Sequence, residues 1–136
     1  MNKQIFINLA VTNLQKSMDF YTALGFTNNP QFSDDSGKCM VWSESIFVML
    51  LNHEKFSSFA SKPIADTKNT LAGLFSLSLE SLEAVNKIME DGLEAGGIEP
   101  SEMKDYVSSF TRLLLKFDYF VFVNLSIFDV EFQVFL

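Results

Sequence analysis

Residues 7–21 have the sequence Ile-Asn-Leu-Ala-Val-Thr-Asn-Leu-Gln-Lys-Ser-Met-Asp-Phe-Tyr, in which alternating apolar residues run directly into a helical pattern. Residues 75–89 repeat this order as Phe-Ser-Leu-Ser-Leu-Glu-Ser-Leu-Glu-Ala-Val-Asn-Lys-Ile-Met. The repeat aligns Val11 with Leu79 and Phe20 with Ile88. A period of two predicts a strand, and recurrence every three or four residues predicts an amphipathic helix. We therefore expect two similar modules with a site between them.

Composition and charge restrict the class of protein. The chain has 136 residues, 48% hydrophobic residues and 15 Phe, which is enough for one compact domain with a substantial core. The net charge of −7 argues against a nucleic-acid surface, which needs clustered Lys and Arg. The apolar run 113–123 contains Lys116 and Asp118 and is too short to span a bilayer. We expect neither a nucleic-acid nor a membrane partner.

The single cysteine, Cys39, leaves no possibility of an internal disulfide. The N-terminal residues run straight into the first predicted strand without an apolar signal segment. Both features favour a cytoplasmic location.

The first module, at about residues 1–53, is predicted to have the order β-α-β-β-β. A capping box, Thr12-x-x-Gln15, starts the helix, and Gly25 ends it. Strands are expected at about residues 5–11, 26–32, 38–43 and 46–52, and the polar residues 54–70 are expected to connect the modules.

The second module, at about residues 71–136, repeats that order. Ser81 is the expected N-cap of a helix over residues 82–95, and Gly96-Gly97 ends it. The expected strands cover residues 71–79, 98–103, 111–123 and 126–136. The predicted class is α+β, with two β-α-β-β-β modules forming a half-open, barrel-like mixed sheet. The alternative is a generic α+β sandwich in which the repeat is coincidental.

Residues 9–26, Leu-Ala-Val-Thr-Asn-Leu-Gln-Lys-Ser-Met-Asp-Phe-Tyr-Thr-Ala-Leu-Gly-Phe, resemble the opening of the vicinal oxygen chelate superfamily, the glyoxalase, bleomycin-resistance and extradiol-dioxygenase group. The resemblance implies paired modules that form a half-open barrel, commonly completed in a dimer. It also implies a concave face that either holds a divalent metal or binds an antibiotic without metal.

The resemblance places the superfamily's metal ligands on four positions of this chain. Three of them carry apolar side chains, Phe6, Val48 and Leu74, and the fourth carries Glu131. A divalent ion needs several oxygen or imidazole ligands that converge on one point. We therefore expect no tightly held metal, with Glu131 as a weak candidate ligand.

The segment 107–136 departs from the superfamily pattern, because it contains no Gly, Pro, His or Trp. Either the second module has diverged, or this segment is translated in a shifted frame relative to its relatives. Both accounts remain open from the sequence.

If the aliphatic faces of the strands pack on the helices, the opposite faces form an apolar pocket with a few polar groups, which is typical of a small-molecule site. Asn8, Ser76 and Glu131 are the candidates to orient a ligand, although the first two could instead satisfy backbone groups, and Glu131 could be solvated. The predicted ligand-binding residues are Phe6, Asn8, Val48, Leu50, Asn52, Leu74, Ser76, Glu131 and Gln133.

Three other residues are weaker candidates for chemistry. His53, the single histidine, lies beside Glu54 and is expected to be a solvated loop residue. Cys39 is expected to pack within a strand, and Trp42 to belong to the core rather than to stack on a ligand.

The functional hypothesis is a glyoxalase/bleomycin-resistance-like protein that binds a small organic molecule, with catalysis left open. One alternative is a divalent-metal-dependent lyase, isomerase, transferase or dioxygenase of the same superfamily. Another is a ligand-free homodimerisation module. A homodimer is the expected assembly in any case, since the half-barrels of the superfamily commonly need a partner.

Overall fold

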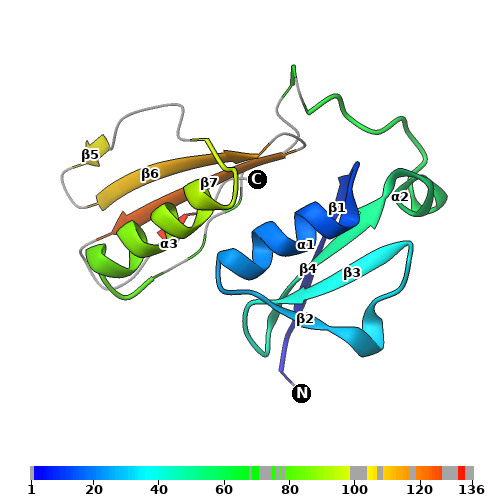
Figure 1. Cartoon of the computed structure of the whole chain (residues 1–136), viewed down its shortest axis with the longest axis horizontal. Helices are drawn as coiled ribbons and strands as arrows, with labels where there is room; N and C mark the ends of the chain where they lie inside the picture. Colours follow the sequence, from blue (N-terminus) through cyan, green and yellow to red (C-terminus); the bar gives the residue numbers. More distant parts are fainter. Residues whose placement is uncertain are drawn as a thin grey trace. The chain divides into compact units, whose positions relative to one another are not determined.

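The structure, a computed structural model, describes residues 2–67, 69–70, 75, 77, 79–98, 104–106, 109–116, 119–126 and 132–133, and beyond residue 98 it describes the backbone alone. The chain forms two units, Met1–Ile64 and Ala65–Leu136 (Figure 1). The boundary between them falls inside the predicted connection at residues 54–70. Within the described residues, no helix combines the length and apolar character that a membrane span requires.

The first unit is a β-α-β-β-β module followed by one short helix. Its sheet has the order β1-β4-β3-β2, in which β1 runs parallel to β4 and the other pairs are antiparallel, so the sheet is mixed and open. The elements are β1 (Ile5–Val11), α1 (Leu14–Ala23), β2 (Thr27–Asn29), the 3-10 turn η1 (Pro30–Phe32), β3 (Gly37–Val41), β4 (Ile46–Asn52) and α2 (His53–Phe59).

Helix α1 ends as the sequence predicts but starts with a different cap. Gly25 has φ of 98°, in the left-handed region that glycine favours after a helix. The predicted cap at Thr12 is wrong, because Asn13 is the N-cap and its side chain accepts a hydrogen bond from the Lys16 backbone at 3.0 Å. Asn and Thr are both good cap residues, and spacing alone did not choose between them.

Two local features of the first unit differ from the prediction. The strand expected at residues 26–32 stops at Asn29, because Pro30 has no N–H for a ladder and begins the η1 turn. The stretch expected as a polar connection begins with helix α2, whose first turn is capped by Asn52 accepting from the Lys55 backbone at 2.8 Å.

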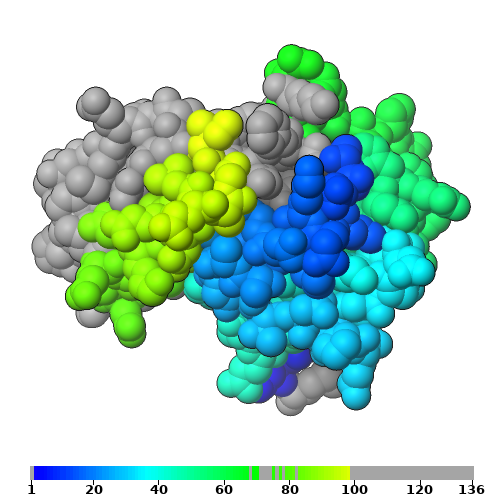
Figure 2. Space-filling view, viewed as in Figure 1, coloured from blue at the N-terminus to red at the C-terminus, as the bar shows by residue number. Residues whose placement is uncertain are grey.

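The core of the first unit lies between α1 and one face of the sheet. Phe20 and Tyr21 of α1 are buried, as are Met40, Val48 and Leu50 of the strands. Figure 1 shows α1 crossing this sheet, and in Figure 2 the same helix, in blue, forms part of the visible surface of the unit. Burial of these apolar side chains is the main source of stability in a unit of this size.

The second unit begins with α3 (Leu82–Glu94). Ser81 is its N-cap, accepting from the Ala84 backbone at 3.0 Å, and Gly96 follows it with φ of 93°, both as predicted. A salt bridge of 2.8 Å joins Lys87 and Asp91 one turn apart on its surface. Val85 and Met89 lie on its fully buried side.

An antiparallel sheet of order β5-β6-β7-β8 follows α3. Its strands are β5 (Lys104–Tyr106), β6 (Ser109–Lys116), β7 (Tyr119–Ser126) and β8 (Phe132–Gln133). The single strand predicted over residues 111–123 is wrong: this stretch belongs to two strands, β6 and β7, in which Lys116 pairs with Tyr119. An apolar run shows no alternation that would mark where the chain reverses. The strand predicted at 71–79 lies mostly outside the described residues, and its described residues 75, 77 and 79 are not in a strand.

Candidate functional site

The register between β1 and β4 decides which residues share a face of the first sheet. Asn8 pairs with Met49, and Ala10 pairs with Leu51, so these residues lie on the face opposite α1, which we call the open face. The same register places Val48, Leu50 and Asn52 beside Ile7, Leu9 and Val11, on the face that α1 covers. The prediction that those three β4 residues share a face with Phe6 and Asn8 is therefore wrong, because the alternation of β4 is shifted by one residue.

This error has a simple physical origin. A one-residue shift moves every side chain of a strand to the other face of the sheet. Strand β4 has apolar residues at both sets of alternating positions, so its sequence does not reveal which face is buried. Val48 and Leu50 are core residues with almost no exposed surface. Asn52 has a structural role as the cap of α2.

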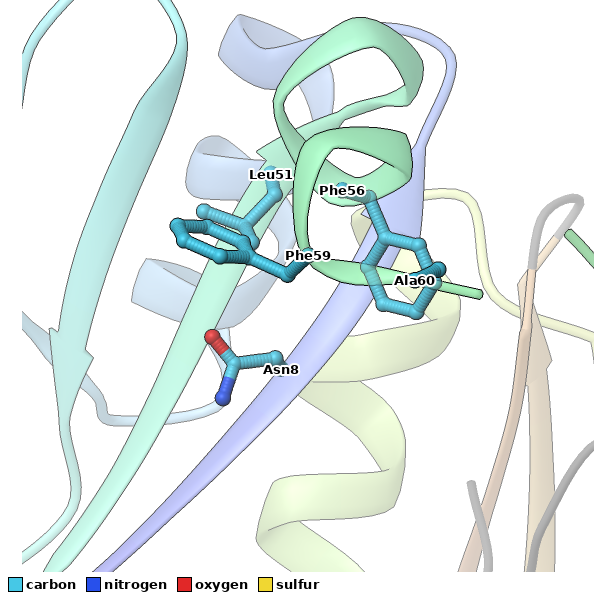
Figure 3. Close-up of a pocket in the computed structure, with 5 residues that line it drawn as sticks. All are labelled: Asn8, Leu51, Phe56, Phe59 and Ala60. Carbon is cyan, nitrogen blue, oxygen red and sulfur yellow. The ribbon is translucent and has the colours of Figure 1, made fainter. Parts of the chain in front are cut away.

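Helix α2 and the open face enclose a depression of about 440 Å³, which we call the α2 pocket. Figure 3 shows its residues, which come from β1, β4, α2 and the residue after α2. Within the described part of the chain, the lining residues are Asn8, Leu51, Phe56, Phe59 and Ala60. Asn8 is the polar member of this set, and all five residues belong to the first unit.

The two phenylalanines lie three residues apart on one helical turn. Phe56 is half-buried, whereas 73% of the surface of Phe59 is exposed. The ammonium of Lys55 lies 5.3 Å from the centre of the Phe59 ring, within the range of a cation–π contact. Phe59 therefore presents a large aromatic surface at the mouth of the pocket.

The side-chain amide of Asn8 makes a hydrogen bond through its nitrogen. Its Nδ2 donates to the backbone oxygen of Phe6 at 3.3 Å, and the side chain is exposed on edge strand β1. Among the residues that the structure describes, this is the one predicted ligand-binding residue that lines the α2 pocket. Its neighbour Phe6 lies on the same face but outside the pocket lining.

Phe6 stacks on Phe47 with ring centres 4.6 Å apart and planes 9° from parallel. The resemblance places a metal ligand at Phe6, but two stacked rings offer no lone pair to a divalent ion. Val48, another such position, is buried on the opposite face. In the part of the chain that the structure describes, no group of three or more His, Cys, Asp or Glu could hold a metal. The described residues at the superfamily's metal positions do not fit an ion.

The remaining candidates are placed as follows. Cys39 is buried in β3, and desolvation raises the pKa of its thiol, which disfavours the nucleophilic thiolate. His53 is exposed in the first turn of α2 rather than in a loop. Trp42 is half-buried and packs on Phe26, with ring centres 4.9 Å apart.

Four predicted residues belong to the second unit. Leu74, Ser76 and Glu131 lie outside the described residues, so their roles stay predictions. Gln133 is in β8, where its backbone pairs with Asn124.

The residues predicted from the sequence do not include four that line the α2 pocket, namely Leu51, Phe56, Phe59 and Ala60. A usable pattern was present, because Asn52 is a good N-cap and Phe56 and Phe59 follow it at helical spacing. A helix of seven residues is too short for its periodicity to stand out from a polar connection.

No protein-family model matches the chain, and no curated protein matches it at a significant level. Solved structures do match. A hypothetical protein from S. aureus is 25% identical, with a TM-score of 0.72, over 90% of this chain and 92% of its own.

Two further solved structures also match the chain. A glyoxalase/bleomycin resistance protein/dioxygenase family enzyme from Burkholderia phytofirmans PsJN is 14% identical, with a TM-score of 0.68, over 90% of this chain and 98% of its own. A glyoxalase/bleomycin resistance protein/dioxygenase from Nocardioides is 16% identical, with a TM-score of 0.62, over 88% and 83%. The chain therefore has the α+β fold of the glyoxalase/bleomycin resistance/dioxygenase proteins, which is the fold that the resemblance in residues 9–26 predicts.

Proposed function

We propose that this protein binds a small, flat, largely apolar organic molecule in the α2 pocket. The observation that carries the proposal is the lining itself: four apolar side chains and one amide around about 440 Å³. Small-molecule sites have this constitution, and their volumes run from roughly 300 to 1,000 Å³. The ligand would be held in the cytoplasm, where the lone cysteine Cys39 remains a thiol.

The exposed ring of Phe59 favours an aromatic ligand. An exposed phenylalanine contributes little to the fold, but a ligand ring placed against it removes apolar surface of both partners from water. Offset or edge-on contact between two rings adds about 0.5–1.5 kcal/mol beyond burial. Phe56 and Leu51 would contact the rest of the ligand on the inner side of the pocket.

The proposal is for binding without metal rather than for a metal-dependent lyase, isomerase, transferase or dioxygenase. The stacked Phe6–Phe47 pair stands where the superfamily resemblance puts a ligand, and Phe6, Val48 and Leu74 all lack donor atoms. Binding by this protein should therefore persist in EDTA.

The test is a titration of isotopically labelled protein with indole, quinoline and naphthalene, followed by backbone amide chemical shifts. Saturable shifts are expected at Leu51, Phe56 and Ala60. Phe59→Ala should weaken binding by roughly tenfold, since it removes ring contact and apolar area.

Phe32→Ala is the matched control. Phe32 is 67% exposed, close to the 73% of Phe59, but lies in η1 and does not line the pocket. Shifts that grow linearly without saturation, or equal losses for Phe32→Ala and Phe59→Ala, would contradict the proposal.

A further inference from the structure

We infer that the α2 pocket selects aromatic ligands that carry an N–H or O–H donor, because Asn8 presents a hydrogen-bond acceptor to the bound molecule. The inference rests on the proposed function and specifies the ligand chemistry of the same site. It is carried by the orientation of one amide in an otherwise apolar lining.

The backbone fixes which end of the Asn8 amide is available. Its Nδ2 donates to the carbonyl of Phe6, two residues earlier on the same strand, at 3.3 Å. No hydrogen bond to its Oδ1 is found among the described residues. Figure 3 shows the oxygen on the side of the Phe59 ring and the nitrogen on the far side. The pocket therefore offers an acceptor next to an aromatic surface.

This arrangement discriminates between ligands of the same shape. A ring N–H or O–H placed beside Asn8 replaces the water that its oxygen would otherwise bind. A ligand without a donor removes that water and leaves the amide oxygen unpaired against apolar atoms, which is unfavourable. The other described lining residues, Leu51, Phe56, Phe59 and Ala60, have no polar side-chain group that could compensate.

Indole and benzothiophene form a suitable pair of probes, since both are flat bicyclic rings and only indole has an N–H donor. The quantity to measure is the ratio of their dissociation constants, benzothiophene over indole, because the ratio cancels most of the shared apolar contribution. Asn8→Leu keeps the side-chain size but removes the acceptor. It should lower the ratio by roughly fivefold, which corresponds to about 1 kcal/mol for one hydrogen bond.

Asn8→Asp is the matched control, because a carboxylate keeps the acceptor and should leave the ratio no lower than in the unmodified protein. Asn8 is exposed on edge strand β1, so neither variant disturbs the core, and the thermal midpoint verifies folding. An unchanged ratio in Asn8→Leu, with both probes still weakened by Phe59→Ala, overturns the donor selectivity and leaves the binding function standing. Absence of saturable binding by both probes overturns the two together.

Discussion

Asp34 closes the turn between η1 and β3 by accepting three hydrogen bonds. Its Oδ1 lies 2.7 Å from the Ser36 backbone nitrogen, 2.7 Å from the Ser36 hydroxyl and 3.0 Å from the Gly37 nitrogen. The Ser36 hydroxyl is the largest cause that lowers the pKa of this carboxyl below its ordinary value of 3.8, followed by the Ser36 backbone. All three donors favour the charged form.

The lowered pKa predicts a specific dependence of stability on pH. A carboxyl whose pKa is lower in the folded chain than in the unfolded one stabilises the fold above the unfolded value, and that contribution disappears as the pH falls through the folded value. Between about pH 4 and the folded pKa, the unfolding free energy of Asp34→Ala should therefore decrease less steeply than that of the unmodified protein.

Urea denaturation at a series of pH values measures this slope. Asp35→Ala is the control, since Asp35 is the adjacent exposed carboxylate and makes none of the three turn bonds. Identical slopes for Asp34→Ala and the unmodified protein would show that the hydrogen bonds of the turn do not stabilise the charged carboxylate of Asp34.

At the scale of the elements, the contact between β3 and β4 shapes the α2 pocket. Gly37 pairs with Leu51, and a Cβ at Gly37 would lie 2.8 Å from Leu51 Cδ2 and 3.3 Å from the Leu50 carbonyl oxygen. Because Gly37 has no side chain, the side chain of Leu51 can lie against the backbone of β3. The volume available beside α2 depends on that position of Leu51.

Gly37→Ala should consequently affect both stability and binding. The new methyl group must displace Leu51 and press on a backbone oxygen, and overpacking of this kind costs about 1–3 kcal/mol. We expect a lower unfolding free energy in urea and weaker indole binding, because Leu51 moves toward the pocket.

A double-mutant cycle with Leu51→Ala isolates this contact. In the Leu51→Ala background the added methyl group meets no side chain, so Gly37→Ala should cost markedly less there. Additive costs in the two backgrounds would rule out a direct clash between residues 37 and 51.

At the scale of the whole molecule, the exposed apolar residues of the first unit favour self-association. Ile5 and Phe6 are about half exposed, at 53% and 51%, and lie on β1, an edge strand of its sheet. An edge with apolar side chains is a common pairing surface. We expect a homodimer through a surface that includes this end of β1.

Sedimentation equilibrium measures the mass in solution. A species of twice the 15.4 kDa chain mass is expected at micromolar concentration, and Phe6→Lys should shift it toward monomer. Phe32→Lys is the control for an exposed aromatic residue elsewhere. A single 15.4 kDa species at high concentration would contradict the prediction.

Local interactions made much of the fold predictable. Strand β4 has the bounds predicted for it, Gly25 and Gly96 end helices with positive φ, and Ser81 caps α3. Each of these features depends on residues that are neighbours in the chain, so the sequence carries the information directly. The strand-helix repeat likewise pointed to a fold that the solved structures confirm.

The candidate site depended on the tertiary structure. Which face of β4 is open follows from its pairing with β1, 41 residues away in sequence, and Val48 and Leu50 were assigned to the wrong side for that reason. Phe56 and Phe59 become pocket residues only when α2 packs against the open face. The sequence by itself determined the module order and the helix ends. Strand register and helix packing, which are contacts between residues distant in the chain, determined the pocket.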